Sequence, residues 1–364
     1  MVFAAYALFT VLFSVFSYSF IDPNLMYLKT LYTGFAFTNR LEVSLFYISF
    51  ISVFFGFYLY FLSLVHKKIL TIKFVIVVIL LSIPLLFSYP AMLSYDLFNY
   101  QATAKVIYHY GENPYLVMPI ELAGDPMLLF TRAANKYALY GPLWIVLTGV
   151  PYMSSFGNFI IQLFLFKFFV GLFYVGVVFL LYKLSKSVFT VVFFAMNPLV
   201  LIETFMSGHN DIVMMFFVLL GYHLIKQEKY MLSVLPFVFS VLIKFSTLFL
   251  FPVWIYMYYK KIKNQKLDWG RVWILSLVSM GIIFLLSPLR EEMYPWYFIW
   301  LIPFAALIRH KNLLIWTAAF SGGLLMTYVP YMYTGYYITL YKIIATVCFM
   351  VVFVLLCKVF KQAI

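Results

Sequence analysis

A carboxylate at the start of a polar and aromatic segment is the residue of this sequence best suited to chemistry. Asp96 lies in Ser94-Tyr-Asp-Leu-Phe-Asn-Tyr100, directly after an apolar run. A carboxylate held in place can accept the proton of a hydroxyl group as a general base. The plainer alternative is that Asp96 caps the helix that follows it. Three further acidic residues of the same segment are alternative bases: Glu112, Glu121 and Asp125.

A second polar cluster, Glu203-Thr-Phe-Met-Ser-Gly-His-Asn-Asp211, interrupts two apolar runs. Ionisable side chains are costly at membrane depth and usually functional there. A short turn in which Ser207 or Asn210 caps the next helix is the alternative, but it explains neither Glu203 nor His209. Two ligand types on one turn, with no second histidine that the sequence places beside them, do not predict a metal site. No cofactor is predicted.

Two cations lie outside the basic turns described below. Lys244 stands in the apolar stretch Val241-Leu-Ile-Lys-Phe-Ser-Thr247, and Arg290 in Ser287-Pro-Leu-Arg-Glu-Glu. The partner of Lys244 is either an internal carboxylate, Glu203 or Asp211, or a phosphate group. A solvated loop is the alternative for Arg290. Arg132 and Lys136 are weaker candidates of the same kind.

The composition sets the fold class. Of all residues 65% are hydrophobic and only 10% are charged, and the mean hydropathy is +1.00. Apolar runs long enough to cross a bilayer recur along the chain, so the sequence predicts an all-α polytopic membrane protein. The first run, residues 2–20, has no basic residue before it and no small-residue cleavage site after it, which favours a retained span over a signal peptide.

Charges alternate between the loops. Ten of the twelve acidic residues avoid the basic turns, which are Lys67–Lys73, Lys183–Lys186, Lys226–Lys229, Lys260–Arg271, Arg309–Lys311 and Lys358–Lys361. By the positive-inside rule these turns are cytoplasmic, as are both termini, and the acidic segments face the outside. Topology thus accounts for the net charge of +13, and nucleic acid is not a predicted partner.

Roughly 10 to 12 embedded helices are expected. Two spans fill residues 1–71, a core region follows over 72–310 with a large outer loop at 93–141, and two spans fill 311–364. Residues 96–110 are expected to form a helix along the membrane surface. The short apolar runs around 142–156 and 206–246 predict broken helices around an outward-facing cavity, because such helices are tolerated only where protein or water surrounds them.

Together these features resemble the polytopic glycosyltransferases of the GT-C fold, most closely the prokaryotic mannosyltransferases that depend on polyprenol-phosphate mannose. The resemblance covers roughly residues 72–310. Its motifs are the Asp96 segment with Gly111-x-Asn-Pro-Tyr115, Tyr140-Gly-Pro-Leu-Trp144, Asn197-Pro-Leu with Gly208-His-Asn-Asp211, and the Lys244 segment with Pro295-Trp-Tyr-Phe-Ile-Trp-Leu-Ile-Pro303.

The resemblance implies an enzyme that transfers a hexose, mannose in the closest relatives, from a polyprenyl-phosphate donor to a glycan or glycolipid acceptor outside the cell membrane. Asp96 would be the general base, and Lys244 and Arg290 would bind the donor phosphate. Substrate contacts would come from Tyr95, Tyr100, Glu203, His209, Asn210 and Asp211. The loop has a single Asp96 in place of a tight aspartate pair, which favours a reaction without a metal.

One argument from the residues also favours a lipid-linked donor over a nucleotide sugar. A nucleotide-sugar donor requires a soluble domain of about 100 residues or more, and the longest loop here is about half of that. The alternative from another class is a transporter or lipid flippase in which Glu203, Asp211 and Lys244 line the pathway. A catalytically silent membrane subunit is a third hypothesis.

Overall fold

A computed structural model describes residues 1–289 and 292–359. About three quarters of the chain, 77%, is helical, and the described residues contain no strand. This confirms the predicted all-α polytopic fold. Arg290, one of the two predicted phosphate ligands, lies outside the described residues.

The chain runs through helices that differ greatly in length. The first third contains α1 (Val2–Ser17), α2 (Phe35–Thr38), α3 (Arg40–His66), α4 (Ile72–Leu80) and α5 (Asp96–Tyr108). The middle contains α6 (Pro142–Ser154), α7 (Phe159–Ser185), α8 (Val188–Ala195), α9 (Pro198–Leu201), a π-helical turn (Ile202–Met206), α10 (Asp211–Lys226) and α11 (Tyr230–Ile243). The last part contains α12 (Phe251–Ile262), α13 (Trp269–Leu286), α14 (Ile302–Ile308), α15 (Lys311–Leu325), α16 (Val329–Thr334) and α17 (Thr339–Val359).

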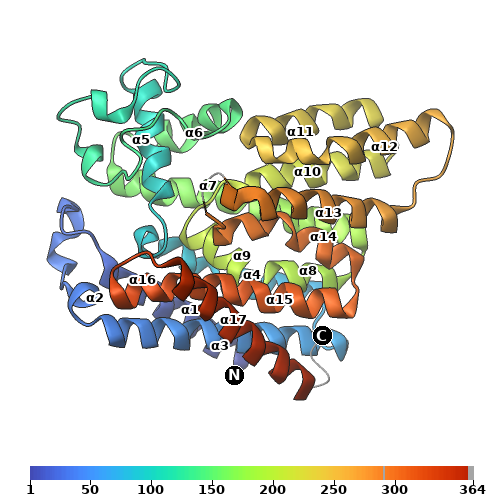
Figure 1. Cartoon of the computed structure of the whole chain (residues 1–364), viewed down its shortest axis with the longest axis horizontal. Helices are drawn as coiled ribbons and strands as arrows, with labels where there is room; N and C mark the ends of the chain where they lie inside the picture. The colour runs from blue at the N-terminus through green and yellow to red at the C-terminus, as the bar shows by residue number, and fades with distance from the viewer. Residues whose placement is uncertain (290–291, 360–364) are drawn as a thin grey trace.

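Six helical segments of the described chain are long and apolar enough to cross a membrane, and a bent pair raises the number to seven. Three shorter apolar helices, Ile72–Phe87, Tyr230–Ile243 and Pro295–Ile308, bring the candidates to ten. The expected 10 to 12 embedded helices are therefore reached only with these short elements. The long helices lie roughly side by side along the long axis of the molecule (Figure 1).

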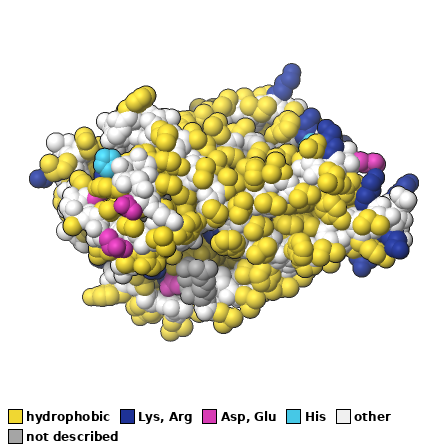
Figure 2. All heavy atoms as spheres, turned by 90° about the horizontal axis from the view of Figure 1, so that it is seen from above, with side chains coloured by type: hydrophobic (Ala, Val, Ile, Leu, Met, Phe, Trp, Pro, Cys, Tyr) yellow, Lys and Arg dark blue, Asp and Glu magenta, His cyan; other side chains and the backbone are white. Residues whose placement is uncertain are grey.

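The two ends of the bundle differ in charge. Basic residues follow the ends of α3, α7 and α10 and occupy the turn between α12 and α13. Figure 2 shows Lys and Arg gathered mainly at one end, Asp and Glu mainly at the other, and a broad hydrophobic surface between them. α5 lies at the acidic end (Figure 1).

The bent pair lies in the apolar stretch of residues 188–206. α8 and the segment Pro198–Met206 meet at an angle of 58°. Pro198 has no N–H to continue the helix, and the Asn197 side chain accepts the N–H of Leu199 and starts a new one. The break therefore falls inside 188–206, before the region 206–246 that the run lengths indicated.

α5 starts at Asp96, where the predicted helix over 96–110 was expected to begin, and ends at Tyr108. Leu97, Phe98, Tyr100 and Gln101 are all buried. These side chains point to different faces of the helix, so its first turns are enclosed by neighbouring helices.

Candidate functional site

Asp96 is the first residue of α5, and Tyr95 holds the N-cap position. The capping hypothesis for Asp96 is therefore wrong: the Ser94 hydroxyl accepts the Asp96 N–H at 3.2 Å, and the Asp96 carboxylate is left for other contacts. The Asn99 amide, one turn later, donates to Asp96 Oδ1 at 3.3 Å. The Asp96 side chain is 28% exposed, so a substrate can reach it.

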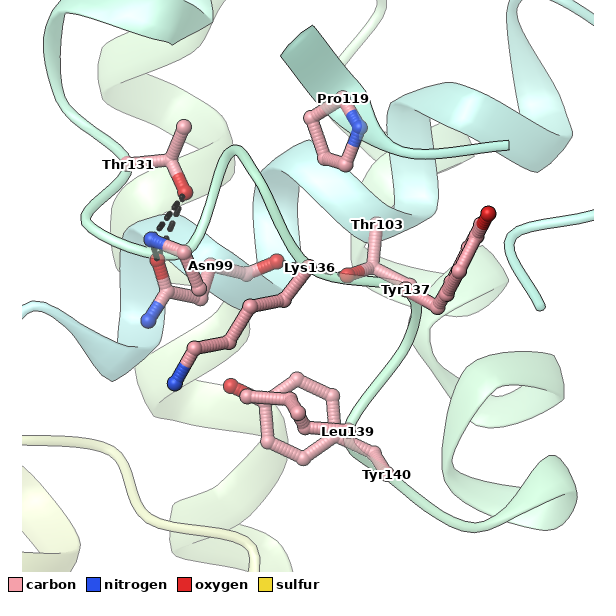
Figure 3. Close-up of a pocket in the computed structure, with 9 residues that line it drawn as sticks. Asn99, Thr103, Pro119, Thr131, Lys136, Tyr137, Leu139 and Tyr140 are labelled. Carbon is pink, nitrogen blue, oxygen red and sulfur yellow. Dashed lines mark hydrogen bonds between the residues drawn. The ribbon is translucent and has the colours of Figure 1, made fainter. Parts of the chain in front are cut away.

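Asn99 also connects α5 to the outer loop by hydrogen bonds. Its Oδ1 accepts the Thr131 hydroxyl at 2.7 Å and the N–H groups of Arg132 and Ala133 at 3.1 and 3.3 Å. Figure 3 shows Asn99 and Thr131 at the edge of a small pocket that Thr103, Lys136 and Tyr140 also line. The loop therefore stands in a fixed position beside Asp96.

His209 lies between two carboxylates. Its Nδ1 is 3.5 Å from Asp96 Oδ2, and its Nε2 is 3.3 Å from Glu203 Oε2. The imidazole is fully buried and stacks on the Trp296 ring at 4.0 Å. Gly208 precedes it with φ +73°, a left-handed conformation that glycine adopts without strain. This turn places the histidine against α5.

Glu203 stands on the π-helical turn and is fully buried. Tyr328 donates its hydroxyl hydrogen to Glu203 Oε1 at 2.9 Å, which leaves Oε2 facing His209. π-Helical turns occur often at functional sites. Side-chain contacts therefore run continuously from Tyr328 through Glu203 and His209 to Asp96.

Asp211 and Lys244 form an ion pair. Lys244 Nζ lies 2.8 Å from Asp211 Oδ1, which also accepts the indole N–H of Trp300. The ammonium lies 4.4 Å from the centre of the Tyr297 ring. The predicted anionic partner of Lys244 is thus the internal carboxylate Asp211. The Lys244 side chain is still 24% exposed.

Asn210 does not cap α10 as the turn hypothesis supposed. It holds the N-cap position, but neither it nor Ser207 makes a side-chain capping bond. Its N–H donates to the Tyr100 hydroxyl at 3.3 Å. The Tyr100 ring packs against Tyr140 and Trp144 at 4.6 and 5.0 Å. The second predicted cluster, Glu203 to Asp211, is thus joined to α5 at the start of α10.

Desolvation among the surrounding helices raises the pKa of Asp96 above that of an ordinary aspartate. His209 and Lys244 act in the opposite direction, as does the hydrogen bond from Asn99, and Asp211 adds to the rise. A carboxylate with a raised pKa is a stronger base when it is ionised. The electrostatics of the site suit proton abstraction by Asp96.

The other candidate bases have different surroundings. Burial tends to raise the pKa of Asp125, but hydrogen bonds from Lys105, Tyr110 and the Met127 N–H lower it overall. Glu121 accepts the Met118 N–H at 2.8 Å, and Glu112 is exposed. Of the four carboxylates, Asp96 is the one in contact with His209. The described residues contain no group of three or more His, Cys, Asp or Glu side chains placed to hold a metal ion.

All eight predicted site residues that the structure describes lie in this region. Tyr95 is the one not yet located: its ring lies 4.4 Å below the Arg132 guanidinium. Lys167 was missed. It is fully buried inside α7, its ammonium donates to the Ser88 carbonyl, and its stem lies near Gly208. A lysine inside an apolar run was the available signal. Trp296, Trp300 and Tyr328 were also missed.

A family model matches residues 3–260: the MptA_B family, described as alpha-(1->6)-mannopyranosyltransferase, N-terminal domain. The match begins before the expected start at residue 72 and includes the first two spans, and it ends before residue 310. Curated proteins and solved structures gave no significant match. The family decides between the enzyme and transporter hypotheses, because the chain belongs to the alpha-(1->6)-mannopyranosyltransferase family and is a membrane glycosyltransferase.

Proposed function

We propose that this protein transfers mannose from a polyprenyl-phosphate donor to a hydroxyl group of a glycan or glycolipid acceptor, with Asp96 as the general base. The family description supports mannose and an α-(1→6) linkage. The contact between Asp96 and His209 at 3.5 Å is the observation that carries the assignment of the base.

The reaction is a single displacement at the anomeric carbon. Asp96 accepts the proton of the acceptor hydroxyl while its oxygen forms the new bond to carbon, and the bond from carbon to the phosphate oxygen breaks. The electron pair of that bond leaves with the polyprenyl phosphate. His209 and Glu203 orient the Asp96 carboxylate and offer a path along which its proton is passed on.

The leaving phosphate gains charge, and a fixed cation lowers the energy of that state. Lys244 suits this role. Its ammonium group has three N–H donors, and within the described structure one of them is given to Asp211, so the others can bind phosphate oxygens. The pair with Asp211 holds the ammonium in position before the donor arrives. Arg290 remains a second candidate for this role.

We place the site on the extracytoplasmic side and both termini in the cytoplasm. α5 lies at the end of the bundle where Asp and Glu gather, and the basic turns lie mainly at the other end (Figure 2). The positive-inside rule assigns the basic end to the cytoplasm. A reporter fused after α7, whose C-terminus carries Lys183 and Lys186, tests this orientation.

Transfer of radiolabelled mannose from polyprenyl-phosphate mannose to a membrane glycolipid extract tests the function. The wild-type protein in detergent is compared with Asp96→Asn and with Glu112→Gln, the matched change of an exposed carboxylate on the same loop. We expect transfer by the wild type and by Glu112→Gln, and loss of at least about 100-fold in Asp96→Asn, with donor binding retained.

Full activity of Asp96→Asn excludes Asp96 as the base. Loss of transfer in Glu112→Gln with activity in Asp96→Asn moves the role to Glu112. If wild-type protein binds no lipid-linked sugar and transfers none, the donor class is wrong.

A further inference from the structure

An apolar groove of about 860 Å³ opens at the end of the bundle that carries α5. It lies between the end of α1, residues 28–39 and the start of α7. Its walls are mainly hydrophobic and include Tyr18, Leu28, Leu31, Phe35 and Phe164. A groove of this shape and polarity suits an extended hydrocarbon chain.

Aromatic contacts connect this groove to the first turn of α5. The ring of Tyr18, in the groove wall, packs on Tyr89 at 6.2 Å, and Tyr89 packs on Phe98 at 6.2 Å. On the other wall Phe159, the neighbour of the lining residue Ile160, stacks on Phe98 at 6.0 Å. Phe98 lies on the same first turn of α5 as Asp96, so a relay of ring contacts leads from both walls of the groove to that turn.

A cation stands at the same helix turn. The Arg132 guanidinium lies 4.4 Å above the ring of Tyr95, which itself packs on Phe98 at 5.9 Å. Among the described residues no carboxylate forms an ion pair with Arg132, whereas Lys244 is paired with Asp211. A guanidinium presents its donors in a planar fork that matches phosphate oxygens.

We propose that the groove and Arg132 together form the binding site of the lipid-linked donor, with the polyprenyl chain in the groove and the phosphate on Arg132. This inference rests on the proposed function and deepens it. The anomeric carbon, attached to the phosphate, then lies beside Asp96. Lys244 approaches the same phosphate from the α11 side, so that two cations from different parts of the chain share its charge.

The combination of features selects this occupant. An amphiphile with an anionic head and a long apolar tail is complementary to an apolar groove next to a cation, and the proposed donor is such a molecule. An ordinary bilayer lipid also fills apolar surface, but its binding has no reason to change the kinetics of a donor. Dependence of the KM on the length of the donor chain therefore separates the two occupants.

The test compares a donor with a geranyl chain and a donor with a full-length polyprenyl chain. Leu31→Trp and Leu28→Trp fill the groove, and Leu8→Trp adds the same bulk to an exposed position of α1 outside the groove lining. We expect each groove variant to raise the KM of the long donor by about tenfold, since displacing two methylene groups from the groove suffices for that change. The KM of the geranyl donor and the kinetics of Leu8→Trp should stay as in the wild type.

Arg132 is tested with the same two donors. Arg132→Gln should raise the KM of both by about tenfold or more, because both carry the phosphate, and Arg132→Lys should recover part of the loss. An unchanged preference for the long chain in both groove variants overturns the role of the groove. An unchanged KM in Arg132→Gln overturns the role of Arg132.

A direct binding measurement keeps this inference distinct from the proposed function. A polyprenyl phosphate with a photoreactive group in its tail is crosslinked to the wild-type protein, and the labelled peptides are mapped. Labelling of residues 28–39 and of the start of α7, reduced in Leu31→Trp, supports the groove even if no mannose is transferred. Labelling elsewhere contradicts it even if transfer depends on Asp96.

Discussion

Glu203 and Asp96 lie on opposite sides of one imidazole: His209 Nε2 is 3.3 Å from Glu203 Oε2, and His209 Nδ1 is 3.5 Å from Asp96 Oδ2. A buried carboxylate on the far side of a histidine fixes the orientation of the ring. Because Glu203 is fully buried and reaches Asp96 only through His209, we expect it to act as a positioning residue.

Glu203→Gln should therefore lower kcat by about 10- to 100-fold with little change in the donor KM. The amide keeps the size of the side chain but removes the negative charge opposite His209. Thr204→Val is the matched control, because Thr204 is buried on the same π-helical turn and its hydroxyl has no hydrogen-bond partner. Steady-state kinetics of the two variants check this. Equal losses in both would mean that the turn is merely sensitive to substitution.

The Asp211 and Lys244 pair should stabilise the fold chiefly by mutual neutralisation. Asp211 is fully buried, so Lys244→Met leaves a buried charge with Trp300 as its donor and should cost about 3 kcal/mol of unfolding free energy. The double change Lys244→Met and Asp211→Leu should recover much of that cost, because it removes both charges.

Thermal unfolding in detergent of the wild type, the two single variants and the double variant measures the coupling. Additive losses in the double variant would show that the two side chains do not depend on each other. Mannosyl transfer should be low in Lys244→Met and in the double variant, since the proposed phosphate contact is absent whenever Lys244 is replaced.

The polar clusters of the site were predictable because charge is rare in this chain. With only 10% charged residues, Glu203, His209, Asp211 and Lys244 stand out between apolar runs, and the cost of burying them points to function. Aromatic partners had no such signal: residues of this type make up 22% of the chain. Trp296, which stacks on His209, lies in the Pro295–Pro303 motif of the resemblance, but its residue type alone does not separate it from the other aromatic rings.

The local backbone was harder to predict than the fold class. The apolar pattern of 188–206 is continuous, and only the Asn197-Pro198 pair marks the 58° bend. The helix of the Asp96 segment was predicted, but the burial of Leu97, Phe98 and Tyr100 depends on packing against other helices, which the sequence does not show. The partner of Lys244 also needed the three-dimensional structure, because both Glu203 and Asp211 were compatible with the sequence.

The acid limb of the pH profile should follow the pKa of Asp96. That pKa is raised, so a base that must be ionised loses activity as the pH falls through a value above the ordinary aspartate pKa of about 3.9. Asn99→Asp replaces a donor to Asp96 with a second carboxylate, which disfavours ionisation of Asp96 and raises its pKa further.

The acid limb of kcat in Asn99→Asp should thus move to higher pH, while activity at alkaline pH is less affected. Rates measured over the full pH range with saturating donor check the shift. The new carboxylate still accepts from Thr131, so the loop should keep its place. A limb that does not move would separate the titrating group from Asp96.

Gly141, the residue before α6, should be intolerant of any side chain. A Cβ there would come within 2.1 Å of the Leu242 carbonyl oxygen, and the Gly141 N–H donates to the Ile243 carbonyl at 3.2 Å. Gly141→Ala must therefore push apart α6 and the end of α11, the segment that leads directly to Lys244. We expect a loss of about 1 to 3 kcal/mol in unfolding free energy, together with a raised donor KM.

Gly56→Ala is the matched control for this change. Gly56 lies inside α3, and a Cβ there meets nothing within 4 Å. Because alanine favours a helix over glycine by up to about 1 kcal/mol, this variant should be as stable as the wild type or more stable, with unchanged kinetics. A Gly141→Ala protein that unfolds like the wild type would show that α6 can shift without cost, and the close contact with α11 would then have no part in placing Lys244.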